Sequence, residues 1–420
     1  MGNNTTNDPI SPEVNGRSLL EEVLIDGARR MLQAVIEEEV DDFIKKHQNQ
    51  RDKCGHQLAT RNGYRTPRKI LTSMGPIEIK QPRVDDRKLR ARTSEEGFSS
   101  NILPRFLRRT PSLDTLIPVL YLKGVSTGDF DTALKAILGN AGSISASTVA
   151  NLKAVWEKEY KEWTKRDLSQ KEYAYFWADG IYFKVRGEEE KSCTLVIIGA
   201  DSEGHKEFLA MEEGFRESKL SWKSLLLDLK KRGLDNGPKL AIGDGALGFW
   251  AALEEVFPGT KEQRCWVHKT ANILDKLPRK LQTTAKKEIQ EMYMAPDKES
   301  ALQSFDNFVK VYGEKYPKAA ACLVKDKEQL FTFYDFPAIH WVHIRTTNPV
   351  ESTFATIRHR TYKTRNCGSR TTVLTMVYKL GIESEKRWHK LKGYNIIPFV
   401  MAGERFINGV LEEKEQKAVI

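Results

Sequence analysis

The 420-residue chain lacks long apolar runs and has few cysteines. No stretch approaches the ~18 apolar residues that a membrane span needs, and residues 1–16 have neither the basic start nor the apolar middle of a signal peptide. The five cysteines are odd in number and scattered, which argues against a disulfide framework and suits a reducing compartment. We therefore expect a protein that stays inside the cell and has no membrane partner.

Internal repeats and low-complexity tracts are also missing. With 40% hydrophobic and 30% charged residues, the composition is that of a globular protein, neither collagen-like nor disordered. The length predicts two to four domains with at least one sizeable core.

The chain carries 67 basic and 57 acidic side chains, a net charge of +10 that is unevenly distributed. Residues 61–110 contain 13 Lys/Arg and 5 Asp/Glu, and residues 352–370 contain five basic residues and no acid. The remainder is slightly acidic. A solvated basic face explains one such segment, but two separated segments favour a polyanion, because phosphate contacts release counterions. The candidate contacts are Arg61, Arg65, Arg68, Lys69, Arg358, Arg360, Lys363 and Arg365.

The N-terminal third is predicted to be mainly helical. Apolar residues at helical spacing over 17–44 predict one or two amphipathic helices, whose apolar stripe serves a core or a dimer contact. A turn and an alternating strand are expected at 74–80. Three short helices are expected over 111–165, which fits a helix-turn-helix fold but equally any small helical domain. The expected divisions are a helical region (1–60), a basic DNA-binding segment (61–110) and a three-helix domain (111–168).

The middle of the chain has the pattern of a mixed α/β sheet domain. Strands are predicted at 174–186, 192–200, 207–211, 239–243 and 261–265, with helices at 218–231 and 246–257. After residue 271 the pattern is helical for about seventy residues, with breaks at Pro278, Pro296 and Pro317, and a last helix starts at Asn348. These segments predict an α/β core in two parts, 169–270 and 346–420, around an all-α region, 271–345.

Three acidic residues stand out, and each has a purely structural explanation. Asp179 and Gly180 lie between two β-like runs, which is typical of a hairpin turn. Asp244 follows a short strand and precedes a helix, where an aspartate caps the helix or makes the turn. Glu351 lies three residues after Asn348, as in a capping box with proline at the first helical position.

Taken together, the three acids suggest a metal site. Acids on a first strand, at the end of a later strand and on a terminal helix can converge in the crevice beyond the strand ends of an α/β sheet. Carboxylates are the hard oxygen ligands that Mg²⁺ or Mn²⁺ prefers. Two such ions can activate a water or a 3′-hydroxyl and stabilise the leaving oxygen of a phosphodiester.

Several sequence blocks around these acids occur in a familiar order. They are ADGIYFKVR (178–186), IGDG (242–245), VFPGT (256–260), CWVH (265–268) and TTNPVES (346–352), preceded by RNGYR (61–65), MGPIEI (74–79) and LKGVST (122–127). In this order they resemble the signature blocks of the Mutator-type transposases of bacterial insertion sequences. The resemblance extends from about residue 60 to 370, most of the chain.

This resemblance implies an α/β fold with an RNase H-like catalytic core, interrupted by an all-α insertion and preceded by helical DNA-binding regions. It implies that Asp179, Asp244 and Glu351 form a DDE triad that is catalytic and binds two Mg²⁺ or Mn²⁺ ions. Arg358, seven positions after Glu351, matches a basic residue that such enzymes place two helical turns beyond the glutamate. The implied setting is the bacterial cytoplasm, in association with the nucleoid.

Cys265 and His268 have two interpretations. The resemblance makes them a motif close to the catalytic core with no metal required. The alternative is a zinc site in which they join His340 and His343, since the two pairs have similar short spacings. A single Cys-x-x-His is a loose pattern, so zinc is the less favoured interpretation.

The resulting expectation is a DNA transposase that binds terminal inverted repeats, cleaves the ends with two Mg²⁺ ions and joins the freed 3′-hydroxyl to target DNA. A homodimer on DNA is expected because two ends must be processed together. Two alternatives stay open. One is a DNA-binding protein without chemistry, in which the three acids are turn and cap residues, and the other is an RNase H-like nuclease that acts on unrelated DNA or RNA.

Overall fold

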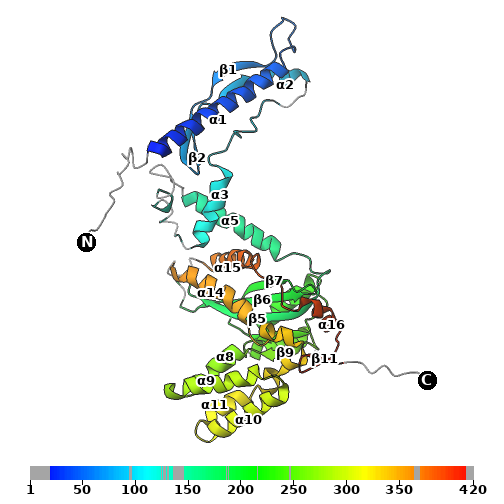
Figure 1. The fold of residues 1–420 in the computed structure, drawn as a ribbon. Helices are drawn as coiled ribbons and strands as arrows, with labels where there is room; N and C mark the ends of the chain where they lie inside the picture. Colours follow the sequence, from blue (N-terminus) through cyan, green and yellow to red (C-terminus); the bar gives the residue numbers. More distant parts are fainter. Residues whose placement is uncertain are drawn as a thin grey trace, which may run out of the picture. The chain divides into compact units, whose positions relative to one another are not determined.

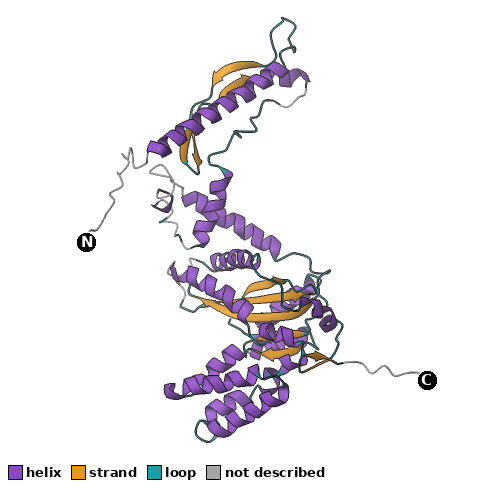
Figure 2. Ribbon diagram, in the orientation of Figure 1, coloured by secondary structure: helices purple, strands orange, loops and turns teal. Residues whose placement is uncertain are grey.

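The computed structural model divides into two compact units, Met1–Leu152 (unit 1) and Lys153–Ile420 (unit 2). It describes residues 19–93, 97–123, 125, 129, 132–135, 146–185, 187, 189–214, 216–245, 247–363 and 369–412. Both units combine helices and strands, so the mixed α/β class is confirmed (Figure 2). Over the described residues, no helix has the length and apolar character to span a membrane. The finer division into six segments stays a prediction.

Unit 1 is built on one long helix and four short strands (Figure 1). Its elements are α1 (Leu19–Lys46), β1 (Thr60–Tyr64), β2 (Arg68–Thr72), β3 (Gly75–Ile79), β4 (Pro82–Asp85), α2 (Arg87–Thr93) and α3 (Pro111–Leu122). β1 pairs with β4 and β2 with β3, both antiparallel, and α1 packs against β3 and β4. The helix expected over 17–44 and the strand expected at 74–80 are confirmed.

The core of unit 1 follows from the alternation in β3. Ile77 and Ile79 are buried and Glu78 between them is exposed, as expected for a strand with one face against a core. They pack with Ile36 of α1 and Leu103. Of the three helices expected over 111–165, the first is α3 and the third is α5 (Ala146–Trp163). The second lies mostly outside the described residues, although 132–135 are helical. A helix-turn-helix stays a prediction.

Unit 2 is organised around a five-stranded mixed sheet in the order β7-β6-β5-β8-β9. The strands are β5 (Tyr173–Phe183), β6 (Ser192–Asp201), β7 (Lys206–Gly214), β8 (Leu240–Gly243) and β9 (Lys261–Arg264), and all five predicted strands are therefore confirmed. β5, β6 and β7 are antiparallel neighbours, whereas β8 is parallel to both β5 and β9.

Helices cover this sheet, which explains why β6 is buried along nearly its whole length. α6 (Lys219–Lys231) and α7 (Leu247–Val256) contribute Trp222 and Phe249 to the same core as Phe176 and Leu195. α14 (Asn348–Lys363) packs against β5 and β6, and α15 (Arg370–Glu385) packs against β7 (Figure 1). Trp222 and Phe249 meet edge to face with ring centroids 4.9 Å apart.

A helical region separates β9 from α14. Its elements are α8 (Trp266–Leu274), α9 (Arg279–Met294), α10 (Lys298–Gly313), α11 (Pro317–Val324), α12 (Lys327–Leu330), two short 3₁₀ turns and α13 (Trp341–Ile344). Pro278 precedes α9 and Pro317 begins α11, as the sequence predicts. After α15 come α16 (Ile397–Met401), β10 (Phe406–Ile407) and β11 (Val410–Leu411).

The strand predicted over 174–186 is confirmed through Asp179, and the alternative explanation of Asp179 as a hairpin-turn residue is wrong. Asp179 and Gly180 do not form a hairpin turn, because β5 runs through them, and Asp179 is paired with Val196 of β6 in an unbroken antiparallel register. The apolar residues on both sides of Asp179 are buried in the sheet, and this burial overrides the local turn preference of an Asp-Gly pair.

α7 packs closely against the backbone before α6 at Gly248. A Cβ at this position would lie 2.4 Å from the backbone oxygen of Glu217 and 2.6 Å from the backbone nitrogen of Lys219. We expect Gly248→Ala to lower the free energy of unfolding by about 1–3 kcal/mol, because backbone atoms cannot yield as a flexible side chain does. Urea unfolding of the variant and the wild type measures this difference in free energy. Gly27→Ala, in α1 with nothing within 4 Å of the new Cβ, is the control and should be neutral or stabilising by up to about 1 kcal/mol. Equal effects would contradict the close packing.

Candidate active site

Two aspartates come from neighbouring positions on two parallel strands. The register of β5 and β8 pairs Ala178 with Gly243, and Asp179 and Asp244 are the next residues along the chain. Paired strands lie about 4.8 Å apart, so the two carboxyl groups start from adjacent points of the backbone. Asp244 immediately follows β8, as the sequence predicts, and its Oδ1 accepts a hydrogen bond from the Gly245 amide at 2.6 Å.

Asp179 is a buried carboxyl group that lies near other acids and near the imidazole of His268. Its side chain belongs to a residue that is only 8% exposed, and Oδ1 accepts a hydrogen bond from the Gly180 amide at 2.8 Å. Burial raises the pKa of Asp179 to about 7, and the negative charges of Glu217 and Asp244 add to this effect, whereas His268 opposes it. The fold therefore disfavours the charged form of Asp179.

Glu351 lies in the first turn of α14 and is held by Thr347. The Thr347 hydroxyl donates to Oε1 of Glu351 at 2.9 Å, and the Glu351 amide donates to the Thr347 carbonyl at 3.0 Å. The capping-box prediction is therefore displaced by one residue: Asn348 is the first helical residue, and Thr347 precedes it. Cys265 anchors this turn, since its sulfur accepts from the Thr347 amide at 3.3 Å and lies 3.3 Å from the Thr347 hydroxyl oxygen.

His268 links the glutamate to the two aspartates. Its Nε2 lies 3.8 Å from Oε1 of Glu351. Contact with Cys265, together with the charges of Asp244 and Asp179, raises the pKa of His268 to about 9, although burial opposes the rise. One imidazole thus lies within the electrostatic reach of all three acids. The Cys265-x-x-His268 motif, predicted to lie near the core, supports the geometry of Glu351 from α8.

A fourth carboxylate, Glu217, was missed by sequence analysis. It lies just before Ser218, the N-cap of α6, and accepts a hydrogen bond from the Tyr182 hydroxyl at 3.2 Å. Burial raises its pKa, and Asp244 adds to the rise. A Cβ on Gly180 would lie 2.7 Å from Oε1 of Glu217, so the glycine after Asp179 makes room for this carboxylate. Gly180 is the one signal in the sequence that points to such a close approach.

Arg264 was also missed, and it holds Asp244. It ends β9, is 6% exposed, and donates from Nη1 to Oδ1 of Asp244 at 2.5 Å and from Nε to Oδ2 of Asp326 at 3.1 Å. Asp326, between α11 and α12, also accepts from Lys269 at 2.6 Å. A buried network therefore connects Asp244 to the helical region. A Cβ on Gly245 would lie 2.2 Å from the guanidinium carbon of Arg264, which explains the glycine after Asp244.

The basic residues after Glu351 are only partly described. The Arg358 guanidinium lies 5.7 Å from the centre of the Phe354 ring on the same helix. Arg360 and Lys363 belong to α14, but their side chains are not among the described groups, and Arg365 lies outside the described residues.

The four basic residues chosen in unit 1 have different surroundings. Arg61 lies 3.6 Å from Asp41, and Arg68 donates to main-chain carbonyls, including that of Pro104 at 2.8 Å. Arg65 is exposed and lines a cavity, and Lys69 is exposed on β2. Arg61 and Arg68 thus contact other groups of unit 1, whereas Arg65 and Lys69 are exposed.

The second histidine pair lies apart from Cys265 and His268. His340 Nδ1 is 2.7 Å from the Tyr175 hydroxyl and its Nε2 is 2.9 Å from the Gly393 carbonyl oxygen. His343 Nε2 accepts from the Lys392 amide at 3.1 Å. Over the described part of the chain, the group with metal-ligand spacing contains Cys265, His268 and Glu351 instead. The four-ligand zinc alternative does not match this arrangement.

The raised pKa of Asp179 makes stability depend on pH. The pKa of Asp179 is about 7 in the folded chain, against an ordinary value of 3.8. As the pH rises, the unfolded chain loses this proton first. The free energy of unfolding therefore falls between pH 4 and 7, and the full loss is present above pH 7. We expect Asp179→Asn to be more stable than the wild type at pH 8, by up to about 4 kcal/mol, with the gain vanishing near pH 4. Urea unfolding in metal-free buffer at both pH values measures it. Asp306→Asn, at a 70% exposed side chain, is the control. A less stable Asp179→Asn at pH 8 would contradict the burial of an uncompensated acid.

Arg264 should matter for stability more than an exposed arginine does. We expect Arg264→Met to lower the free energy of unfolding by about 3 kcal/mol, because it leaves Asp244 and Asp326 without their shared cation. Arg216→Met removes an arginine from a pair in which both side chains are about two-thirds exposed and should cost less than about 1 kcal/mol. Chemical denaturation compares them, and equal losses would show that the buried network contributes nothing.

Comparison with known proteins shows which family the chain belongs to. The family model described as "Transposase, Mutator family" matches residues 13–391. The chain is 47% identical to the transposase for insertion sequence element IS6120 of Mycolicibacterium smegmatis over 302 residues, which covers 72% of this chain and 93% of the relative. It is 48% identical to the transposase for insertion sequence element IST2 of Acidithiobacillus ferrooxidans over 279 residues, covering 66% and 94%. The match to the transposase for insertion sequence element ISRM5 of Rhizobium meliloti is 30% over 371 residues, covering 87% and 88%. The chain therefore belongs to the Mutator family of transposases.

Proposed function

We propose that this transposase cleaves DNA at the ends of an insertion sequence and joins the freed 3′-hydroxyl to target DNA, with Asp179, Asp244 and Glu351 as its catalytic triad. The observation that carries the proposal is the register of β5 and β8, which starts two carboxyl groups from adjacent backbone positions. His268, within reach of both aspartates and of Glu351, supports their convergence.

The donor set suits divalent cations. Asp179, Asp244 and Glu351 offer carboxylate oxygens, the ligands that Mg²⁺ and Mn²⁺ prefer. Burial raises the pKa of Asp179, and the negative charges of Glu217 and Asp244 add to the rise although His268 opposes it. A divalent cation bound there would favour the ionised form of Asp179. Two ions in this place would supply activation of the attacking oxygen and stabilisation of the leaving oxygen.

The residues around the triad hold it in position. Arg264 and the Gly245 amide both donate to Oδ1 of Asp244, and the Thr347 hydroxyl donates to Oε1 of Glu351. Each carboxylate therefore keeps its second oxygen for other partners. In cleavage, a water oxygen attacks phosphorus, the bond to the 3′-oxygen breaks and that oxygen gains a proton. In joining, the 3′-hydroxyl attacks a target phosphodiester in the same way.

Two wider parts of the proposal concern architecture. We infer an RNase H-like core from the sheet, in which three antiparallel strands are followed by two parallel ones, with α8 to α13 as an all-α insertion between Asp244 and Glu351. The ends are bound by unit 1, and the protein acts as a homodimer on DNA. Exposed Leu20, Val23 and Leu24 on α1 support a contact between copies.

The test is strand cleavage by the full-length protein on an oligonucleotide duplex that carries one end of the element. We expect Asp244→Asn to lower the cleavage rate more than about 100-fold, because even residues that only orient metal ligands contribute 10–100-fold. Asp306→Asn, the same exchange on an exposed part of α10, should cleave like the wild type.

The outcomes separate the alternatives. Equal cleavage by Asp244→Asn and the wild type would show that the triad is assigned incorrectly. Products that do not depend on the end sequence would indicate a nuclease. Metal-independent binding without cleavage by the wild type would indicate a DNA-binding protein without chemistry.

A further inference from the structure

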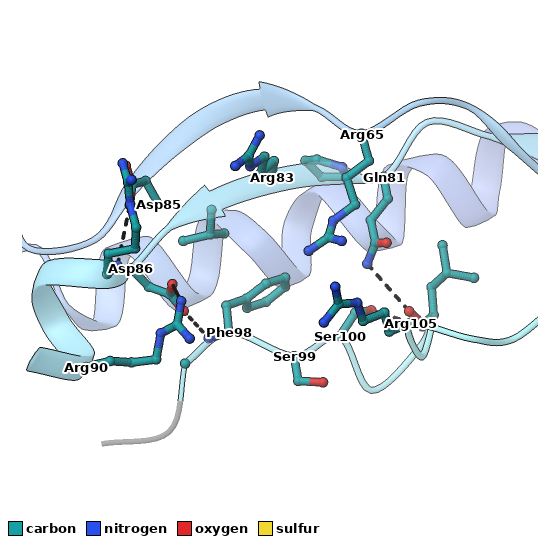
Figure 3. Close-up of a pocket in the computed structure, with 15 residues that line it drawn as sticks. Arg65, Gln81, Arg83, Asp85, Asp86, Arg90, Phe98, Ser99, Ser100 and Arg105 are labelled. Atoms are coloured by element: carbon teal, nitrogen blue, oxygen red, sulfur yellow. Dashed lines mark hydrogen bonds and ion pairs between the residues drawn. The ribbon is translucent and has the colours of Figure 1, made fainter. Parts of the chain in front are cut away.

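Unit 1 contains a cavity of about 460 Å³ with a strongly basic lining. It lies between the β1–β4 pair, the start of α2 and residues 97–105 (Figure 3). Its charged lining residues are five arginines and two aspartates: Arg65, Arg83, Arg87, Arg90, Arg105, Asp85 and Asp86.

Both aspartates are already neutralised by neighbouring arginines. Arg87 donates from Nε and Nη2 to the two carboxylate oxygens of Asp85, at 3.0 and 2.8 Å, and holds the pKa of Asp85 at about 2. Arg90 pairs with Asp86 at 2.8 Å, and the other Asp86 oxygen accepts from the Phe98 amide at 2.6 Å. The net charge of the lining therefore resides on the remaining three arginines.

Arg65, Arg83 and Arg105 are exposed, and none forms an ion pair with a carboxylate among the described residues. Figure 3 shows the Arg65 and Arg105 side chains extending toward each other across the cavity. Two guanidinium groups that face each other repel unless an anion lies between them. Guanidinium groups bind phosphate oxygens through two parallel hydrogen bonds, so a phosphate is the anion that suits this arrangement.

The backbone that carries these arginines is fixed by internal hydrogen bonds. The Arg65 amide donates to the Gln81 carbonyl at 2.8 Å, which ties the end of β1 to the start of β4. Arg68 donates to the carbonyls of Pro104 at 2.8 Å and Leu103 at 3.3 Å, directly before Arg105. Arg68 thus positions the segment that carries Arg105, and the site needs little ordering when a ligand binds.

An aromatic residue lies beside this basic group. Phe106 is 85% exposed, and the Arg105 guanidinium lies 5.7 Å from the centre of its ring. An exposed aromatic side chain next to arginines is typical of surfaces that bind nucleic acid, where it packs on bases or sugars while the cations contact phosphates.

The geometry points to this cavity as a binding site for the phosphodiester backbone of duplex DNA, with Arg65, Arg83 and Arg105 as the phosphate ligands and Phe106 at its edge. This inference rests on the proposed function, because it assigns the end-binding role of unit 1 to three named side chains. Phosphate contacts position the protein on DNA and carry no sequence information directly. The arginines should therefore contribute to binding of any duplex, end sequence or not.

The experiment measures binding of the full-length protein to two fluorescent duplexes, one with the end of the element and one with the same bases scrambled, over a range of salt concentrations. The variant Arg65→Ala/Arg83→Ala/Arg105→Ala should weaken binding to both duplexes about tenfold or more near 0.1 M salt. Its salt slope, log K against log [salt], should be shallower by up to about 3, since each phosphate contact contributes about 0.9.

Three controls make the result specific. Arg29→Ala/Arg30→Ala/Lys45→Ala removes the same charge from exposed positions of α1, with side chains 51%, 76% and 73% exposed, and should change both quantities little. The lysine version of the cavity variant should keep the slope but bind less tightly, because lysine cannot donate in the paired geometry. If the triple variant melts at a lower temperature than the wild type, Arg83→Ala alone replaces it in the experiment. We expect this single variant to change the salt slope by about 1.

The outcomes distinguish the two proposals. Cavity variants that bind both duplexes like the wild type, or no worse than the α1 control, would overturn the cavity assignment and leave the proposed function intact. Weaker binding of both duplexes by a protein that shows no preference for the end sequence would support the cavity and overturn end recognition. Tighter binding of a duplex RNA of the same sequence than of the DNA would overturn DNA as the occupant.

Discussion

The parallel pairing of β5 with β8 is the constraint on which the candidate active site depends. Ala178 is in register with Gly243, so the residues that follow them, Asp179 and Asp244, start from adjacent points of the backbone. α14 packs on β5 and carries Glu351. Gathering acids in a partly buried place is unfavourable, and the chain compensates with Arg264 on one aspartate and His268 among all three. Gly180 and Gly245 provide the space that these arrangements need.

The two units use charge in opposite ways. In unit 2 the acids of the candidate site are partly buried, and their mutual repulsion favours a cation near them. Arg264, which accompanies them, is itself buried and paired with Asp244. In unit 1 the acids of the cavity are neutralised by their neighbours, and unpaired arginines remain on the surface. Both settings occur in one chain, and this chain belongs to a transposase family.

Periodicity in the sequence was sufficient for most regular elements, because β5, β6 and β8 are largely apolar runs and α6, α9 and α11 begin beside a serine or a proline. It predicted the strand through Asp179 correctly, whereas the local turn preference of the Asp-Gly pair did not hold, because Trp177 and Ile181 are buried in the sheet. Glu217 and Arg264 belong to no local pattern, since their importance comes from contacts with residues distant in sequence. Net charge located the basic segment of unit 1, yet it could not separate Arg65, which lines a cavity, from Arg68, which supports the backbone.

The order of elements along the chain also sets the order in which the site is made during synthesis. The strand with Asp179 and the strand with Asp244 emerge first, and Glu351 follows only after the helical region that contributes Asp326. At about 5–20 residues per second, Glu351 is made roughly 10–30 s after Asp179. From the synthesis of Asp244 onward, the nascent chain contains the complete basic segment of unit 1 and both aspartates, but not yet Glu351. The three acids are therefore present together only after the five-stranded sheet and the whole helical region of unit 2 have been made, and before α15 and α16.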